Sequence, residues 1–421
     1  MKIAILGAGI VGLTTAYQLT RDGHDVIVVD RQADVSLECS YANGGFIAIS
    51  QAVPWSSPGV LLRVLTTMFR SDAPILLHPS QLPKIWRWGL EFLSCSSAPI
   101  SWENTKHILS LALYSLGLLR KVRDEANIDY FQRTNGCLKI YADQHSFEES
   151  AKAQEPQIPL GIDFKVLDAA QCIKMVPALD ETRQKLAGGI FVPDEEGGDC
   201  YEFAKVLSQT IREAGGEFRF SSAIEGVEME GNRVAKIITS TGSITADRYV
   251  LAAGADAPLI MQSHGVRLPI IPVKGYSLTL SRDPWPDAPD LQIVDEKNLF
   301  GLNPLGTNRL RLAGLAEIAG YNRAPQRRRT DAFIAGFLDR FPQLEACLDR
   351  SNPEPFCCLR PVTPNGLPIL GQSRFTNLFY NIGHGHLGWT LAHGTARIVA
   401  DLIAGKSPAL DVTACRPRPT Y

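Results

Sequence analysis

Two glycine clusters in this chain have the spacing of turns that bind negatively charged groups. The first, Gly7–Gly12, directly follows the apolar run Lys2–Leu6. Glycines at this spacing let the backbone approach a pyrophosphate, and a helix that starts behind them points its N–H groups at it. A second apolar run, Asp25–Val29, leads to Asp30, whose carboxylate would accept hydrogen bonds from a ribose 2′-OH and repel a 2′-phosphate. These residues predict a site for an adenine dinucleotide other than NADP.

The second cluster, Gly383–Gly388, follows the run Asn377–Ile382 near the end of the chain. Apolar residues at helical spacing continue behind it from Leu391 to Ile403. A strand, a glycine turn and a helix N-terminus again make a site for negative charge, which on a flavin develops at the N1–C2=O edge during reduction. Two such turns in one chain favour FAD over NAD.

The elements around the first turn form a βαβ unit, with a helix expected over Ile10–Leu19. The pattern does not then continue as the series of βα units that is typical of nicotinamide dehydrogenases. Instead, Asp199 is expected to cap a helix, with Glu202 three residues on and Gly215 at its end. Short strands are expected after it, at 218–220, 224–230, 234–239, 243–246 and 248–254. This order of helix, β-meander and strand is typical of two-domain FAD proteins.

Composition limits the class of protein. A chain of 421 residues is too long for one ordinary core, so we expect two domains. The net charge of −2 argues against a nucleic-acid-binding surface. Nine cysteines without paired spacing predict neither a disulfide framework nor a metal site, which fits a cytoplasmic protein. The run 327–329, three arginines, is expected to be a solvated helix start.

The expected fold is α/β with two domains. A Rossmann-like FAD-binding domain of the glutathione-reductase type, with a β-meander, should consist of residues 1–60, 198–258 and 355–421. An α+β substrate domain with a mixed or antiparallel sheet should consist of residues 61–197 and 259–354. Pro272–Leu280 and Arg309–Leu312 are strand candidates in this second domain.

The chain resembles the FAD-dependent D-amino-acid oxidase superfamily, and within it the bacterial D-amino-acid dehydrogenases. Besides the first glycine cluster, the resemblance rests on Ser40–Gly45, Ala52–Gly59, Pro272–Ser277, Leu359–Gly366, Gly383–Gly385 and Gly388–Thr390. It implies hydride transfer from the α-carbon of a D-amino acid to flavin N5, with electrons passed on to a quinone-type acceptor. The D-amino acids expected as substrates include cyclic ones, such as D-proline or a hydroxy-D-proline.

Three residues are expected in the catalytic site. The resemblance implies that Arg360 holds the substrate carboxylate, and a planar guanidinium does match a carboxylate with two hydrogen bonds. Tyr276 is expected either to point its hydroxyl into the pocket or to be a half-buried aromatic residue of a strand. His384 either tunes the flavin or is held by the backbone for structural reasons.

The cofactor should be FAD, bound without a covalent bond. Cys358 has the spacing at which monomeric sarcosine oxidases attach flavin, but those enzymes lack the arginine, so Cys358 is expected to be a packing residue. The residues expected to bind FAD are Gly7, Gly9, Ile10, Val11, Gly12, Asp30, Arg31, Ser40, Asn43, Gly44, Gly45, Ile224, Gly254, Gly383, Gly385, Leu387, Gly388, Trp389 and Thr390.

Two questions stay open at this stage. The segments 60–69 and 75–93 are rich in Leu, Ile and Trp, and they either dock on the inner face of the cytoplasmic membrane or roof the substrate pocket. The function has two alternatives: an oxygen-using oxidase of glycine- or sarcosine-like amines, or a non-catalytic dinucleotide-binding redox sensor.

Overall fold

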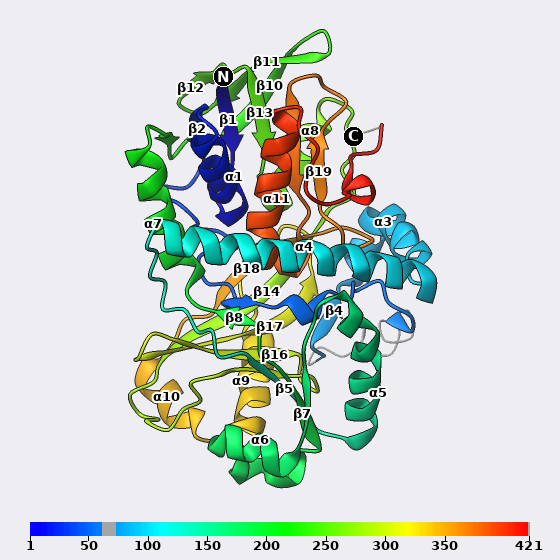
Figure 1. Cartoon of the computed structure of the whole chain (residues 1–421), viewed down its shortest axis with the longest axis vertical. Coiled ribbons are helices and arrows are strands. Elements are labelled where there is room, and N and C mark those ends of the chain that lie inside the picture. Colours follow the sequence, from blue (N-terminus) through cyan, green and yellow to red (C-terminus); the bar gives the residue numbers. More distant parts are fainter. Residues whose placement is uncertain (61–72, 420–421) are drawn as a thin grey trace.

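The computed structural model describes residues 1–60 and 73–419 and contains two main sheets (Figure 1). The first has six strands in the order β19-β20-β13-β1-β2-β9, all parallel except β19. The strands are β1 (Lys2–Leu6), β2 (Asp25–Val29), β9 (Glu217–Arg219), β13 (Arg248–Leu251), β19 (Ile369–Gln372) and β20 (Leu378–Ile382). The fingerprint strands predicted from sequence are thus confirmed at the centre of a parallel sheet.

Helices cover this sheet. They are α1 (Ile10–Arg21), α7 (Cys200–Glu213) and α11 (Gly388–Ile403), with α1 packed against both of the others. The Asp199 carboxylate caps α7 by accepting from the backbone N–H of Tyr201 at 3.0 Å, as the sequence predicts. The long helix α4 (Ala98–Glu125) crosses the middle of the molecule and packs on α11 (Figure 1). It therefore belongs to the core of this half, although residues 61–197 were expected in the other domain.

A separate three-stranded sheet follows α7. It consists of β10 (Ile224–Glu230), β11 (Arg233–Thr239) and β12 (Gly242–Ile244), all antiparallel. The expectation that the strand at 218–220 opens this meander is wrong, because β9 pairs in parallel with β2 instead. Parallel pairing with β2 makes β9 the edge strand of the first sheet and extends that sheet by one strand.

The second main sheet has nine strands in the order β18-β14-β17-β16-β15-β5-β7-β6, with β4 added beside β17. Most of its pairs are antiparallel, while β15 with β5 and β17 with β4 are parallel. Its strands are β4 (Ile75–Leu77), β5 (Cys137–Tyr141), β6 (Lys165–Asp168), β7 (Gly188–Val192), β14 (Ile271–Ser281), β15 (Gln292–Asp295), β16 (Phe300–Leu305), β17 (Arg309–Ile318) and β18 (Phe356–Val362). Since β18 pairs with β14, residues 356–362 belong to the nine-stranded sheet, although the segment from 355 onward was expected in the FAD-binding domain.

Shorter elements complete the chain. In the described part of the chain the remaining α-helices are α3 (Leu82–Ser94), α5 (Gln144–Gln154), α6 (Ala169–Met175), α8 (Ala257–Gln262), α9 (Arg327–Arg340) and α10 (Leu344–Ser351), and β3 (Phe46–Ile47) pairs with β8 (Glu196–Gly197). The expectation that the arginines at 327–329 form a solvated helix start is wrong for Arg329. Its side chain is 1% exposed and donates to the carbonyls of Ala73 and Pro74. Arg327, by contrast, is exposed.

Candidate active site

A cavity of about 1510 Å³ connects the first glycine turn with Arg360. It is walled by loops at the ends of the parallel strands and by one face of the nine-stranded sheet. Of the expected cofactor and catalytic residues, all line it except Gly12, Leu387 and Thr390. Thr390 instead accepts a hydrogen bond from the backbone N–H of Ala48 through its hydroxyl, at 3.1 Å.

The first turn is a cradle that only glycine permits. Gly7 has a φ of +123°, and a Cβ there would lie 2.6 Å from the Ala252 carbonyl oxygen. A Cβ at Gly12 would overlap the Gly7 carbonyl, so Gly12 acts by close packing of helix on strand rather than by lining the cavity. The N-cap residue of α1, Gly9, has no side chain, and the Ser40 hydroxyl accepts from the Ile10 N–H at the helix start, at 3.1 Å. The backbone at this turn therefore fits a pyrophosphate.

Asp30 lies at the carboxyl end of β2 on the cavity wall. Its carboxylate accepts hydrogen bonds from the backbone N–H of Ala8 at 2.6 Å and of Gln32 at 2.9 Å. Burial raises the pKa of this carboxyl. Asp30 thus fixes the glycine turn itself, besides offering its remaining lone pairs to the cavity.

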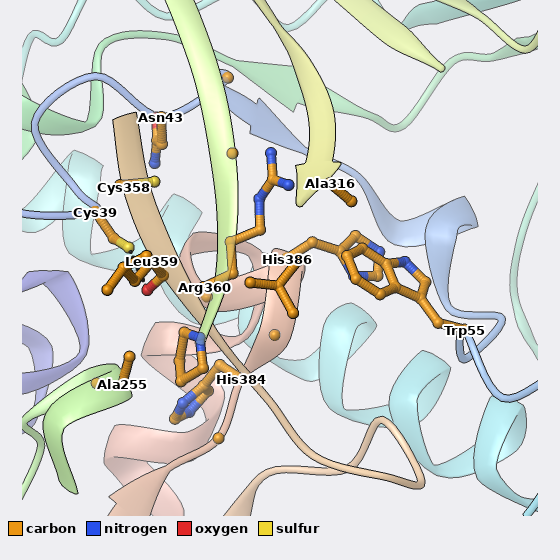
Figure 2. A pocket seen from close by; sticks show the side chains of 18 of the residues that line it. Cys39, Asn43, Trp55, Ala255, Ala316, Cys358, Leu359, Arg360, His384 and His386 are labelled. Carbon is orange, nitrogen blue, oxygen red and sulfur yellow. Dashed lines mark hydrogen bonds between the residues drawn. The ribbon is translucent and has the colours of Figure 1, made fainter. Parts of the chain in front are cut away.

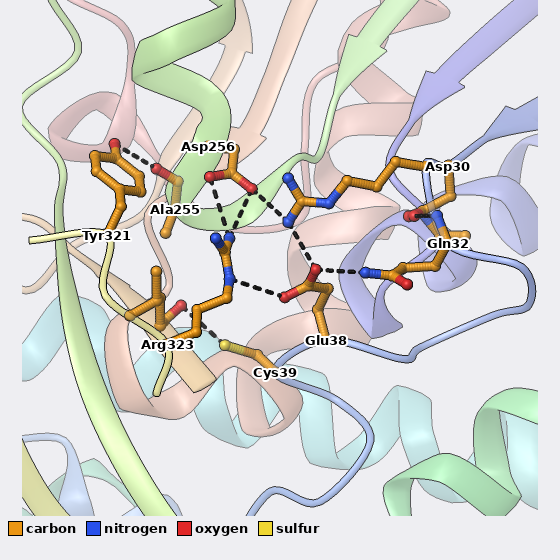
Figure 3. Close-up of polar contacts among 11 residues, drawn as sticks. Asp30, Gln32, Glu38, Cys39, Ala255, Asp256, Tyr321 and Arg323 are labelled. Atoms are coloured by element: carbon orange, nitrogen blue, oxygen red, sulfur yellow. Dashed lines mark hydrogen bonds and ion pairs between the residues drawn. The ribbon is translucent and has the colours of Figure 1, made fainter. Parts of the chain in front are cut away.

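Four charged side chains close a ring beside this end of the cavity (Figure 3). Arg31 lies 2.7 Å from Glu38 and 2.8 Å from Asp256. Arg323 lies 3.4 Å from Glu38 and 3.1 Å from Asp256. Arg323 follows β17 of the nine-stranded sheet, whereas the other three residues flank the parallel sheet, so the ring ties the two sheets together across the cavity.

The second turn faces the cavity from the start of α11, which lacks a side-chain cap. His384 lines the cavity, and its Nε2 lies 3.1 Å from the Thr395 hydroxyl. Burial lowers the pKa of His384 to about 3, so the ring is neutral near pH 7. The indole N–H of Trp389 is buried and has no protein partner among the described residues. A free helix N-terminus and an unused donor fit the electron-rich edge of a flavin.

Arg360 projects from β18 over Gly275, where any side chain would overlap the guanidinium. One Nη of Arg360 donates to the Leu315 carbonyl at 2.7 Å and the other contacts the Gly314 carbonyl at 3.5 Å. These two acceptors lie on β17, so the sheet holds the guanidinium at the cavity wall (Figure 2). A guanidinium has five N–H donors, and those left over can bind a carboxylate.

Trp55 and His386 lie beside Arg360, and sequence analysis gave neither of them a role (Figure 2). Their rings are stacked, with centroids 5.2 Å apart and planes 17° from parallel. Burial and the positive charge of Arg360 lower the pKa of His386 to about 4. Neither residue belongs to a regular helix or strand pattern that could have shown this pairing, although Trp55 lies inside a motif of the family resemblance and His386 lies between two of them.

Tyr276 does not direct its hydroxyl into the cavity. In the β14–β18 ladder Arg360 is opposite Val273, so strand alternation places Tyr276 on the other face of the sheet. Its hydroxyl donates to the Glu317 carboxylate at 2.7 Å, and the side chain is 2% exposed rather than half-buried. The expected role in the pocket is therefore not supported by its position.

Cys358 lies on the cavity wall together with Cys39, which donates to the Leu359 carbonyl at 2.9 Å (Figure 2). A hydrogen bond with Cys39 is the main cause that lowers the pKa of the Cys358 thiol. Cys358 thus borders the same cavity as the two glycine turns.

No helix among residues 1–60 and 73–419 combines the length and the apolar character that a membrane crossing needs. In the same residues, no group of three or more His, Cys, Asp or Glu side chains could hold a metal ion.

Comparisons with known proteins agree with the geometry. The chain is 42% identical to a D-amino acid dehydrogenase of Paramagnetospirillum magneticum, over 98% of this chain and 97% of that protein. It is 39% identical to one of Dechloromonas aromatica, over 97% and 98%. Glycine oxidase of Geobacillus kaustophilus has a similar fold, with a TM-score of 0.76 at 20% identity, covering 98% of this chain and 97% of that one. The model of the FAD dependent oxidoreductase family matches residues 2–402, and the chain therefore belongs to this family.

Proposed function

We propose that the chain is an FAD-dependent dehydrogenase of D-amino acids. The observation that carries this proposal is Arg360, a guanidinium held by β17 carbonyls on the wall of the same cavity that both glycine turns face. The names of the relatives at 39–42% identity support the same substrate class. The family alone does not select it, because a similar fold also serves glycine oxidase.

The chain's own residues would position the substrate for oxidation at its α-carbon. FAD, when bound, supplies the hydride acceptor at N5. Arg360 would bind the carboxylate through its free N–H groups, and the Trp55–His386 stack would limit how the α-carbon can rotate about that clamp. The N-terminus of α11 would stabilise negative charge that develops at the flavin N1–C2=O edge. An imino acid product then reacts with water to give a 2-oxo acid and ammonia.

The binding of FAD is proposed to be non-covalent. Unfolding the yellow holoprotein in denaturant should release all flavin into the filtrate, because turn contacts and hydrogen bonds end when the chain unfolds. Flavin that stays with the unfolded chain would show a covalent bond instead, and Cys358 would be its first candidate because its thiol lines the cavity.

Electrons are proposed to leave through a quinone-type acceptor that approaches along α3. One side of this helix lines the cavity with Ile85, Trp88 and Phe92. Trp86 and Leu90 of the same helix also line the cavity, yet they are 53% and 60% exposed. A helix whose apolar side chains line a cavity and are partly exposed at its edge can roof a pocket and contact a bilayer surface at the same time. We therefore propose that α3 does both things expected of this segment, contact with a membrane and roofing of the substrate pocket. The rest of the segment includes residues 61–72, which lie outside the described residues.

Anaerobic mixing of the holoprotein with a panel of D- and L-amino acids tests the proposal. D-amino acids should bleach the flavin absorbance and their L-enantiomers should not. D-proline and a hydroxy-D-proline test the narrower hypothesis of a cyclic substrate, and glycine and sarcosine test the oxidase alternative. Adding oxygen or a quinone analogue afterwards should show fast reoxidation by the quinone and little hydrogen peroxide. A flavin that no member of the panel reduces would favour a redox sensor.

A further inference from the structure

The cavity has a polar end that the proposed reaction does not use. Lys139 and Tyr141 of β5, Gln154 at the end of α5, Gln157 in the turn after it, and Glu296 after β15 all line this end. Sequence analysis assigned none of them a role.

This polar end lies on the same face of the nine-stranded sheet as Arg360. Lys139, Val294, Gly301, Ala313 and Ser277 are cross-strand partners in one row from β5 to β14. Ser277 lies four residues from Val273, the partner of Arg360, and side chains two or four residues apart share a face. Lys139 and Arg360 thus lie at the two ends of one continuous surface.

The separation of these two cations fits a small ligand. The carbonyls that hold Arg360 are on β17, and β5 is three strands away, so about 14 Å separates the two backbones. The side chain of Lys139 shortens this gap. A ligand bound at both ends would therefore carry two polar groups several bonds apart.

Lys139 is a buried cation without an anionic partner. It is 4% exposed, and within residues 1–60 and 73–419 its Nζ donates only to the Ser50 carbonyl, at 3.3 Å. It forms no ion pair with any described residue. The nearby Glu195 carboxylate accepts from the Ser50 N–H and hydroxyl through Oε1, at 2.8 and 2.7 Å, and its buried Oε2 has no partner in the described part of the chain. An ammonium has three donors, so two of them are unused. Burying such a group without partners is costly unless a ligand supplies acceptors.

The side-chain oxygens of two buried amides at this end also lack a partner among the described residues. Gln154 and Gln157 are 7% and 1% exposed, and neither side-chain oxygen has a hydrogen-bond partner in the described part of the chain. Glu296, half-buried, is the carboxylate that lines the same end and offers further acceptors. Buried polar groups in folded proteins are nearly always satisfied, so this concentration of unpaired donors and acceptors indicates a polar ligand.

We propose that this end of the cavity binds the side-chain terminus of the substrate, and that the preferred D-amino acids end in a carboxamide or a carboxylate. The side-chain oxygen would accept from Lys139, and the N–H groups of a carboxamide would donate to Gln154, Gln157 or Glu296. This inference rests on the proposed function, because Arg360 must hold the other end of the same molecule. D-glutamine and D-glutamate have the required separation between their polar groups.

The test compares D-glutamine with D-norleucine, an apolar amino acid with a side chain of similar length, by anaerobic flavin reduction of the holoprotein. Wild type should prefer D-glutamine in the second-order rate constant. Lys139→Met should reduce this preference about 10- to 100-fold, the loss of a charge-assisted hydrogen bond. Lys236→Met, which removes a surface lysine of β11, is the matched control and should keep the wild-type preference. Glu296→Gln should shift the preference toward D-glutamate, because it removes a repelling charge.

Several results would overturn the inference. A wild-type preference for D-norleucine would do so, as would an unchanged preference in Lys139→Met with normal flavin content. If Lys139→Met does not retain flavin, Gln157→Leu is the variant to test. Its preference for D-glutamine over D-norleucine should fall about fivefold, the scale of one neutral hydrogen bond. An unchanged preference in this variant would count against the site. If D-norleucine reduces the flavin but no variant changes the preference between D-glutamine and D-norleucine, only this inference fails. If no D-amino acid reduces it, the proposed function itself fails.

Discussion

At the scale of single residues, substrate recognition depends on Arg360. Arg360→Ala should keep its fold and FAD but lose about 2–5 kcal/mol of transition-state stabilisation on D-amino acids, or roughly 30- to several-thousand-fold in kcat/KM. The reason is that two charge-assisted hydrogen bonds fix the α-hydrogen relative to the flavin. Steady-state kinetics with an artificial electron acceptor measure the loss.

The control for Arg360 is Arg350→Ala, which removes an exposed arginine of α10. It should retain wild-type kcat/KM. Near-normal turnover of a D-amino acid by Arg360→Ala, at full flavin content, would remove Arg360 from the site and with it the main argument for an amino-acid substrate.

Asp30 is the residue on which cofactor affinity depends. Asp30→Ala should weaken FAD binding by about 1–3 kcal/mol, the range for a hydrogen bond to a charged group. The structure adds a second reason, since the carboxylate also holds the Ala8 N–H of the glycine turn. Titration of apoprotein with FAD, followed by flavin fluorescence, gives the affinity. Asp25→Ala, an exposed aspartate at the start of β2, should bind FAD normally. Equal affinities for all three proteins would mean that Asp30 does not contribute.

At the scale of elements, helix α11 should make the protein sensitive to acid. His393 is fully buried on this helix, neither ring nitrogen has a partner among the described residues, and burial lowers its pKa to about 3. In the unfolded chain a histidine takes up a proton below about pH 6.5. Between these two pKa values the unfolded state binds more protons, so stability falls as the pH decreases, by about 1.4 kcal/mol per pH unit for this group.

His393→Leu should therefore reduce the loss of stability between pH 6.5 and pH 5 by about 2 kcal/mol. Urea unfolding of the holoprotein at both pH values measures the difference. His145→Leu, with a side chain that is 81% exposed, is the control and should unfold with the wild-type pH dependence. If the His393 variant also follows the wild-type curve, the imidazole is not held neutral as the burial requires.

Helix α3 is the element that should contact a membrane. A double variant, Trp86→Glu and Leu90→Glu, places two charges on its exposed apolar side and should abolish sedimentation with anionic lipid vesicles. Lys84 and Arg87 on the same helix are exposed and favour an anionic surface. Ile158→Glu, at a position that is 52% exposed outside α3, should sediment like wild type. Wild-type protein that stays in the supernatant at low salt would end the membrane proposal and leave α3 as a roof of the pocket.

At the scale of the whole molecule, the two sheets are joined by the ring of Arg31, Glu38, Asp256 and Arg323. Arg323→Ala should accelerate FAD release, because the four residues of the ring line the cavity beside the first glycine turn. These side chains are partly exposed, so the effect should stay within about 1 kcal/mol, or roughly fivefold, and should disappear at high salt. Stopped-flow flavin fluorescence at low and high salt measures it. The control is Arg327→Ala, which removes a fully solvated arginine. If the ring does not bridge the two sheets, Arg323→Ala and Arg327→Ala should release FAD at the same rate.

The sequence alone determined the parts of this protein that depend on local chain geometry. A strand, a glycine turn and a helix N-terminus lie within about ten residues of one another, so Gly7–Gly12 and Gly383–Gly388 could be identified as anion-binding turns. Asp30 and Asp199 were found for the same reason, because their partners are near in sequence.

Only the tertiary structure decided what depends on contacts between distant segments. It placed Arg360 in the nine-stranded sheet, turned Tyr276 away from the cavity and buried Arg329, each through strand pairing or packing across more than 40 residues. The Trp55–His386 stack and the polar end around Lys139 likewise join residues from separate elements. Periodicity shows which face of an element is apolar, but it does not show which other element covers that face, and that choice determines the substrate site.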